Sequence, residues 1–195
     1  MNDALIAQKY IHEANICKLL SLLYCQPNQD TIDTVEYLEQ EISSFCPEKI
    51  GHAEKMRTNL EENTLEEMEV AHAKLFVGPF DLIAPPYGSV YLDDERRVMG
   101  DSTMDALNIY RQAGLNPDPD FKEPPDHITT ELEFLYYVTA KYLESEDSQW
   151  LELRHEFVDK HLNRWLKPFV DKVEESNVVF YPKLAILTKD ILANL

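Results

Sequence analysis

Apolar residues recur with helical spacing along most of this 195-residue chain, and most of its 11 prolines lie between the periodic segments. Glycine occurs at only 5 positions. This pattern favours helices joined by short, punctuated loops. The sequence therefore predicts an all-α fold: a single helical-bundle-like domain over residues 1–195, with roughly eight to ten helices and two Pro-rich functional loops.

Capping residues, glycines and prolines indicate where the predicted helices begin and end. Thr64 and Glu67 form a capping box, and Gly114 is typical of a left-handed helix end. Pro168 and Pro182 are expected to open the last two helices. The other helices are expected over 4–25, 31–45, 64–76, 101–114, 126–144 and 148–166, with one short helix within 47–63, and the two loops over 77–100 and 115–125.

The charge of the chain is strongly negative and unevenly distributed. It has 36 acidic and 18 basic side chains, for a formal net charge of −18. Residues 148–195 are balanced, so all of the net charge lies before Ser148. A nucleic-acid backbone requires a basic surface, so nucleic acid is excluded as a partner. Cationic peptides, basic protein surfaces and metal ions are favoured instead.

The cysteines and the apolar runs bear on location. Cys17, Cys25 and Cys46 are odd in number and contain no C-x-x-C pair, so they are interpreted as reduced thiols in the cytoplasm. The first residues lack a basic n-region, and no apolar run reaches 18 residues. We therefore expect a cytoplasmic protein with neither a signal peptide nor an integral membrane segment.

Two Glu-x-x-His pairs raise the hypothesis of a metal-dependent helical oxidoreductase: Glu69/His72 and Glu152/His155. However, Glu152 is expected to point away from the apolar face of its helix, which favours a solvated acidic face over a metal ligand. His72 and His161 each lie on an apolar stripe, so each is interpreted as a hydrogen-bonded core histidine, with a role in a binding groove as the alternative.

Signatures of other enzyme classes are missing. The chain has no G-x-S-x-G, P-loop, G-x-G-x-x-G or H-E-x-x-H motif. With only 5 glycines, loops that bind phosphate are hard to build. We therefore expect no metal or catalytic residues and no enzymatic reaction.

Two segments differ from ordinary helix-bundle sequence. Residues 84–92 carry Pro85-Pro86 with tyrosines on either side of a serine, and such stiffened aromatic loops suit peptide capture. Residues 123–128 read Glu-Pro-Pro-Asp-His-Ile, in which Asp126 is the expected N-cap of the next helix. Glu131, four residues after His127, is expected on the apolar face of that helix and therefore to have a partner there.

At these segments the chain resembles the TorD/DmsD family of cytoplasmic chaperones, also called redox enzyme maturation proteins. The resemblance rests on Leu75-Phe76-Val77-Gly78-Pro79, Pro85-Pro86-Tyr87-x-Ser89-Val90-Tyr91-Leu92, Met99-Gly100, Phe121-Lys122-Glu123-Pro124-Pro125-Asp126-His127-Ile128, Glu131-Leu132-Glu133-Phe134-Leu135, and His161-Leu162-x-x-Trp165 followed by Phe169. It covers most of residues 65–195. His72 departs from the family, which commonly has an aromatic residue there.

The resemblance implies an all-helical chaperone without an enzymatic reaction of its own. Its partners would be the twin-arginine leader peptide and the apo-molybdoenzyme catalytic subunit, and contact with the export machinery is left open. It would assist cofactor insertion and delay export until maturation. No cofactor would be tightly bound. A nucleotide- or pyranopterin-binding assembly factor, with weak guanine nucleotide or molybdenum cofactor contact, stays as an alternative, and the chain could be a monomer or a dimer.

The resemblance also implies a signal-peptide-binding site, which comprises Leu75, Phe76, Pro86, Tyr87, Ser89, Tyr91, Gly100, Glu123, Asp126 and His127. Of these, Leu75, Phe76, Tyr87 and Tyr91 would take the apolar h-region, and Asp126 with Glu123 would meet the arginines. Acidic charge beside an apolar groove suits such a leader. Because His127 is near Asp126 and Glu131 in sequence, we expect its charged form to be favoured, and binding to vary between pH 6 and 8.

Overall fold

The computed structural model describes residues 3–78, 82–93, 98–116 and 123–195. Within them the structure is helical, as predicted, and the extended pairing found there is an isolated antiparallel bridge between Tyr87 and His127. The helices are α1 (Asp3–Leu23), α2 (Thr31–Phe45), α3 (Ile50–Glu62), α4 (Leu65–His72), α5 (Gly88–Leu92), α6 (Asp101–Gln112), α7 (Ile128–Ser145), α8 (Gln149–Phe157), α9 (Asn163–Glu175) and α10 (Tyr181–Leu192). A 3-10 turn, η1 (Pro47–Lys49), precedes α3, and two π turns, η2 (Ala73–Val77) and η3 (Val158–Leu162), follow α4 and α8.

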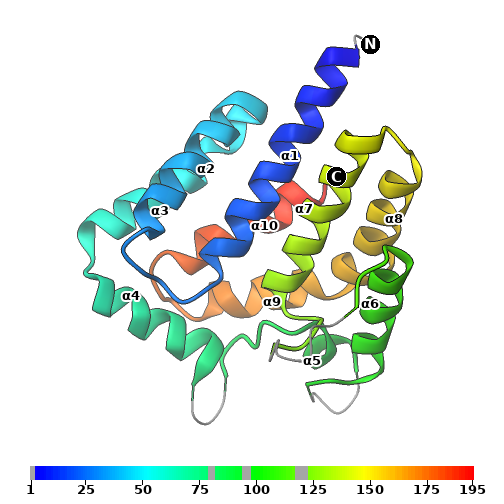
Figure 1. Ribbon diagram of the computed structural model, residues 1–195. Helices are drawn as coiled ribbons and strands as arrows, with labels where there is room; N and C mark the ends of the chain where they lie inside the picture. Colours follow the sequence, from blue (N-terminus) through cyan, green and yellow to red (C-terminus); the bar gives the residue numbers. More distant parts are fainter. Residues whose placement is uncertain (1–2, 79–81, 94–97, 117–122) are drawn as a thin grey trace.

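The long helices α1 and α7 lie side by side through the middle of the bundle (Figure 1). On one side of them α2 packs against α1, and α3 packs against α2 and α10. On the other side α8 packs against α7 and continues through η3 into α9, which packs against α10. Apolar side chains from these helices form one buried cluster, with Phe157, Trp165 and Phe169 among its largest fully buried members. The short helices α4 and α5 lie at opposite sides of the lower end of the bundle, and α6 packs against α5 (Figure 1).

The structure confirms three helix ends that the sequence predicts from capping residues, a glycine and a proline. The Thr64 hydroxyl accepts a hydrogen bond from the Glu67 amide, and the Glu67 carboxylate accepts one from the Thr64 amide, which is the predicted capping box. Gly114 has a φ of +75° just after α6. Pro182 lies at the start of α10, where its missing amide hydrogen costs nothing.

Several helices differ from the predictions in extent or position. Residues 47–63 form η1 and a 13-residue α3, more helix than expected, and α5 lies inside the long predicted loop. The first helix ends at Leu23. Pro168 does not open a helix but lies inside α9, because the buried face of this helix outweighs the one hydrogen bond that the proline lacks.

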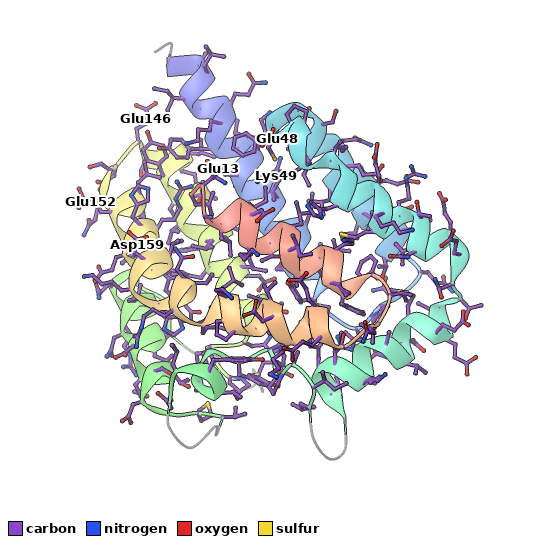
Figure 2. All side chains as sticks on the ribbon, turned by 180° about the vertical axis from the view of Figure 1, so that it is seen from behind. Glu13, Glu48, Lys49, Glu146, Glu152 and Asp159 are labelled. Carbon is purple, nitrogen blue, oxygen red and sulfur yellow. The ribbon has the colours of Figure 1, made fainter. Side chains whose placement is uncertain are left out.

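A buried ion pair joins the first helix to the second half of the chain. Glu13 of α1 accepts a hydrogen bond from the Arg154 guanidinium of α8 at 2.7 Å, and their side chains are 0% and 1% exposed. Figure 2 shows Glu13 inside the bundle, whereas Glu152 and Asp159 project outward at its rim. Breaking such a pair leaves a charge buried without its partner, which typically costs about 3–5 kcal/mol.

Candidate functional site

The two Pro-rich segments meet in space, although the residues that pair are about 40 positions apart. The Ile128 amide donates to the Pro86 carbonyl, and the Gly88 amide donates to the Asp126 carbonyl, each at 2.9 Å. These bonds flank the bridge between Tyr87 and His127. The motifs that the sequence singles out therefore form one site between α5 and the start of α7.

Asp126 holds α5 in place. Its carboxylate is fully buried, and its Oδ2 accepts a hydrogen bond from the Ser89 amide at 2.7 Å. Its Oδ1 has no hydrogen-bond partner in the described part of the chain. The predicted N-cap role in α7 is wrong, because His127 is the cap and its Nδ1 accepts from the Thr129 amide at 3.2 Å. Asp126 instead binds the amino end of the shorter helix.

His127 is a neutral ring in this site. Its ring packs edge-on against Tyr87, with the ring centroids 5.1 Å apart. Burial lowers the pKa of His127 to about 4, although the nearby Asp126 acts in the opposite direction. Since its Nδ1 accepts a hydrogen bond, the cap itself requires the unprotonated nitrogen. The expectation of a charged His127 between pH 6 and 8 is therefore corrected, because desolvation outweighs the neighbouring carboxylate.

The partner of Glu131 is His161 rather than His127. Glu131 Oε1 lies 2.7 Å from His161 Nε2, and Oε2 accepts a hydrogen bond from Trp165 Nε1 at 3.1 Å. All three residues are buried. Burial raises the pKa of Glu131 to about 7. Burial alone would lower the pKa of His161, but the charge and hydrogen bond of Glu131, with other nearby carboxylates, raise it.

Tyr87 and Glu123 form the accessible rim of the site. Tyr87 is half-buried, and its hydroxyl lies 3.4 Å from the carboxylate of exposed Glu123. Burial, followed by the charge of Glu123, raises the pKa of Tyr87 to about 12. Beneath them the Tyr110 hydroxyl donates to the Pro125 carbonyl at 2.9 Å, which fixes the loop that leads into α7. The rim thus offers an aromatic ring and a carboxylate to solvent.

Leu75 and Phe76, which are expected to contact the apolar h-region of a leader, are buried in the core. Leu75 is fully buried in η2, and its carbonyl accepts a hydrogen bond from the Ala84 amide at 3.1 Å. Phe76 is buried against the rings of Tyr24 and Tyr181. Through its carbonyl, Leu75 thus holds the backbone at Ala84 against the bundle.

The other predicted site residues have structural contacts. Gly100 precedes α6 and faces the Asp93 carboxylate so closely that a Cβ would collide with it. That carboxylate accepts a hydrogen bond from the Ser102 hydroxyl at 3.0 Å. Tyr91 stacks on the indole of Trp165, with 5.8 Å between centroids. Pro79, Phe121 and Lys122, which contribute to the resemblance, lie outside the described residues.

The residues of the two Glu-x-x-His pairs do not form a metal site in the described part of the chain. His72 is buried, and its Nε2 lies 3.2 Å from the Tyr24 carbonyl, so it is the predicted hydrogen-bonded core histidine. Burial lowers its pKa. Glu152 is exposed on α8, away from the core, as its helical position predicts. Within the described residues, no group of three or more His, Cys, Asp or Glu side chains is placed to hold a metal ion.

Trp165 and Tyr110 contact the site but are not among the predicted site residues, and His161 is the hydrogen-bonded core histidine that the sequence predicts. The spacing of four between His161 and Trp165 places both on one helix face, which was a usable signal. Their meeting with Glu131 across 30 and 34 positions has no local signature.

Comparison with known proteins places the chain in a family. Residues 17–171 match the family model described as the nitrate reductase delta subunit. The chain belongs to this family. No helix in the described part of this delta-subunit family member is long and apolar enough to cross a bilayer.

Curated relatives of this delta-subunit family member are named as chaperones. A DmsD-type Tat proofreading chaperone of Haemophilus influenzae is 27% identical over 94% of this chain and 83% of that protein. DmsD of Salmonella typhimurium is 31% identical over 66% of this chain, and TorD of Shewanella pealeana is 30% identical over 70% of it. These two matches span 60% and 62% of the relatives' own lengths.

A solved structure gives the same result. The crystal structure of a redox enzyme maturation protein from Archaeoglobus fulgidus is similar with a TM-score of 0.60 and 25% identity, over 92% of this chain and 93% of that one. The predicted resemblance to the TorD/DmsD family is confirmed. So is the predicted class, a system-specific maturation chaperone and not an enzyme.

Proposed function

We propose that this chain binds, in the cytoplasm, the twin-arginine leader peptide and the apo form of a molybdoenzyme catalytic subunit, and that it assists cofactor insertion while delaying export. The names of the Tat proofreading relatives support a leader peptide as the ligand. The observation that carries the proposal is a buried acidic group, Asp126, at the point where the two Pro-rich segments meet.

The charge balance of the site favours a cation. Asp126 is buried and receives a backbone hydrogen bond on one oxygen, while the other oxygen has no partner in the described residues. Glu123 adds a second carboxylate on the exposed rim. His127 is neutral near pH 7, because its pKa is about 4. A guanidinium provides several donors in a planar arrangement that matches carboxylates, which suits arginine better than lysine.

Exposed apolar side chains in the segments around α5 suit the h-region of the leader. The ring of Tyr87 lies at the rim. Val77 and Met99, which flank the α5 segment in the chain, are 63% and 59% exposed. Because Leu75 and Phe76 are buried, Tyr87 and these two side chains are the better candidates for apolar contact.

Calorimetric titration tests the proposal. Twin-arginine leaders from molybdoenzymes of the same genome are titrated beside a twin-lysine leader and a leader with a polar h-region. We expect one leader to bind selectively, and both altered leaders to bind about tenfold or more weakly. Binding of all leaders with equal affinity, or of none, would remove the proposal.

Two variants separate the site from the general acidity of the chain. Asp126→Asn keeps an acceptor for Ser89 but removes the charge, so we expect leader affinity to fall about tenfold. Glu152→Gln removes an exposed charge on α8 and should leave affinity within about twofold. Equal effects of the two variants would mean that only net charge attracts the leader.

The proposal includes no tightly bound cofactor. Weak binding of a guanine nucleotide or of the molybdenum cofactor is tested separately. A thermal-shift screen with either compound tests it, since a ligand that binds the folded state raises Tm.

A further inference from the structure

We infer that Glu131, His161 and Trp165 are positioning residues that hold α5 in the arrangement that binds the leader, without touching the leader themselves. The inference deepens the proposed function and rests on it. It concerns residues that lie beneath α5 and are not part of the exposed rim formed by Tyr87 and Glu123.

The three side chains form one hydrogen-bonded cluster across three elements. Glu131 of α7 lies at the centre, with His161 of η3 on one carboxylate oxygen and Trp165 of α9 on the other. A carboxylate so bound to two donors has a fixed orientation. The cluster of Glu131, His161 and Trp165 is therefore a rigid packing surface, called here the floor of α5.

Helix α5 rests directly on this floor. A Cβ at Gly88 would lie 3.0 Å from Trp165 Nε1 and 3.3 Å from His161 Nε2, so the backbone of Gly88 is in close contact with both. Three residues later, the Tyr91 ring stacks on the Trp165 indole with an interplanar angle of 18°. Both ends of the short helix thus lie against the cluster.

This support matters because α5 has only five residues, Gly88–Leu92. A helix of this length is not stable by itself, so its position depends on tertiary contacts. Those contacts include the hydrogen bonds of the Ser89 and Gly88 amides to Asp126, the packing of α5 on α6, and the cluster beneath Gly88 and Tyr91. Tyr87, which precedes α5 directly, takes its place at the rim from the same contacts.

The protonation of the cluster gives a second measurement, the pH dependence of leader affinity, which would not change if the cluster only stabilised the fold. The groups that act on the pair electrostatically are Asp126 before α7 and Tyr110 and Asp105 on α6, and Tyr91 of α5 packs on Trp165. Burial raises the pKa of Glu131 to about 7, so the cluster changes protonation close to neutral pH. Leader affinity should then vary with pH between about 6 and 8.

The chain offers a matched control for the test. Glu13 is also a fully buried carboxyl group, and it lies 2.7 Å from the Arg154 guanidinium, but it joins α1 to α8. Glu131→Gln and Glu13→Gln each replace a buried carboxyl group by an amide, and only Glu131 contacts the residues beneath α5. Melting temperature and leader Kd are measured for both variants and the wild type at pH 6, 7 and 8.

We expect Glu131→Gln to weaken leader binding about tenfold at pH 7 and to flatten its pH dependence. Glu13→Gln should lower the melting temperature at least as much, while leader affinity stays within about twofold and keeps the wild-type pH profile. Equal affinity losses in the two variants, or an unchanged pH profile in Glu131→Gln, would overturn the inference.

A second variant covers the case in which Glu131→Gln fails to fold. Trp165→Phe keeps an aromatic ring under Tyr91 but removes the indole N–H donor together with part of the indole ring system. It should reproduce the affinity loss in weaker form. Wild-type affinity in a folded Trp165→Phe protein would count against a positioning role for this hydrogen bond.

Hydrogen exchange separates failure of this inference from failure of the proposed function. If no leader binds the wild type, the proposed function fails, but exchange at the Ser89 and Asp93 amides still reports on α5. We expect exchange there to be at least about tenfold faster in Glu131→Gln than in Glu13→Gln. Equal exchange in the two variants would show that the cluster does not hold α5.

Discussion

Tyr87 and His127 face each other across an antiparallel bridge, with their ring centroids 5.1 Å apart and their planes at 68°. This contact explains why His127 stays neutral, since a ring that packs against another ring has little room for water. The loop that precedes Tyr87 and the helix that follows His127 are joined at one point, so any change in the charge of His127 acts on both.

Replacing His127 should make the protein more resistant to acid. The pKa of His127 is about 4 when folded and near 6.5 when unfolded, so the unfolded chain takes up the proton first as pH falls. Stability is then lost between pH 6.5 and 4, by about 2 kcal/mol from pH 7 to pH 5. His127→Asn keeps an acceptor for the Thr129 amide but cannot titrate. Urea unfolding at the two pH values should show a smaller loss in this variant, and an equal loss would contradict the assignment.

Asp126 should stabilise the fold more through the hydrogen bond that it accepts from the Ser89 amide than through its charge. Asp126→Ala removes the acceptor of the Ser89 amide and should cost about 1–3 kcal/mol of unfolding free energy. Asp126→Asn keeps an acceptor and removes a buried charge, so its cost should be below about 1 kcal/mol. Denaturant unfolding of both variants checks this difference. A larger loss in Asp126→Asn would mean that the charge itself stabilises the fold.

The ion pair between Glu13 and Arg154 should show strong coupling. Arg154→Leu removes the guanidinium from the buried Glu13 carboxylate, which keeps only a 3.3 Å contact with the exposed Lys9, and should cost about 3 kcal/mol. Combining it with Glu13→Leu removes the buried charge and should restore a large part of the loss. A double-mutant cycle measured by chemical denaturation tests this, and simple additivity of the two losses would contradict it.

The amino end of α4 should depend on its capping box. Thr64→Ala removes the hydroxyl that binds the Glu67 amide and should cost about 1 kcal/mol, whereas Thr64→Ser should cost much less. Thermal unfolding compares the two variants. Leader affinity should be unchanged in both, because Thr64 is not among the residues that form the site.

Sequence reasoning succeeded where the physical cause is local. The capping box at Thr64, the left-handed Gly114 and the helix start at Pro182 each depend on a few neighbouring residues. Pro168 was misjudged because its local preference is opposed by packing, which a single sequence does not display. Helix α5 was missed because it lacks length and periodicity and is held by Asp126, 37 positions beyond Ser89.

The motif residues of the site were predicted, but their roles were not. Asp126 and His127 are adjacent, and the capping role that the sequence predicts for Asp126 belongs to His127, whereas Asp126 binds α5. Glu131 was correctly expected on a buried face with a partner, but the nearest histidine in sequence was the wrong one. Local spacing cannot weigh burial, and burial decides the charge of His127.

The π turn Val158–Leu162 has a consequence for how members of this family align with one another. A π turn holds one residue more than an α-helical turn, so α8 and α9 are offset by one residue relative to a continuous α-helix. Deleting a single residue within this turn would turn it into an α-helical turn and leave α8 and α9 as one continuous helix, so Trp165 would keep its face toward Glu131. Deleting Asn163 or Arg164, in the regular helix that follows, would instead rotate Trp165 by about 100° away from Glu131. One-residue alignment gaps between this chain and relatives that share the cluster should therefore fall within Val158–Leu162.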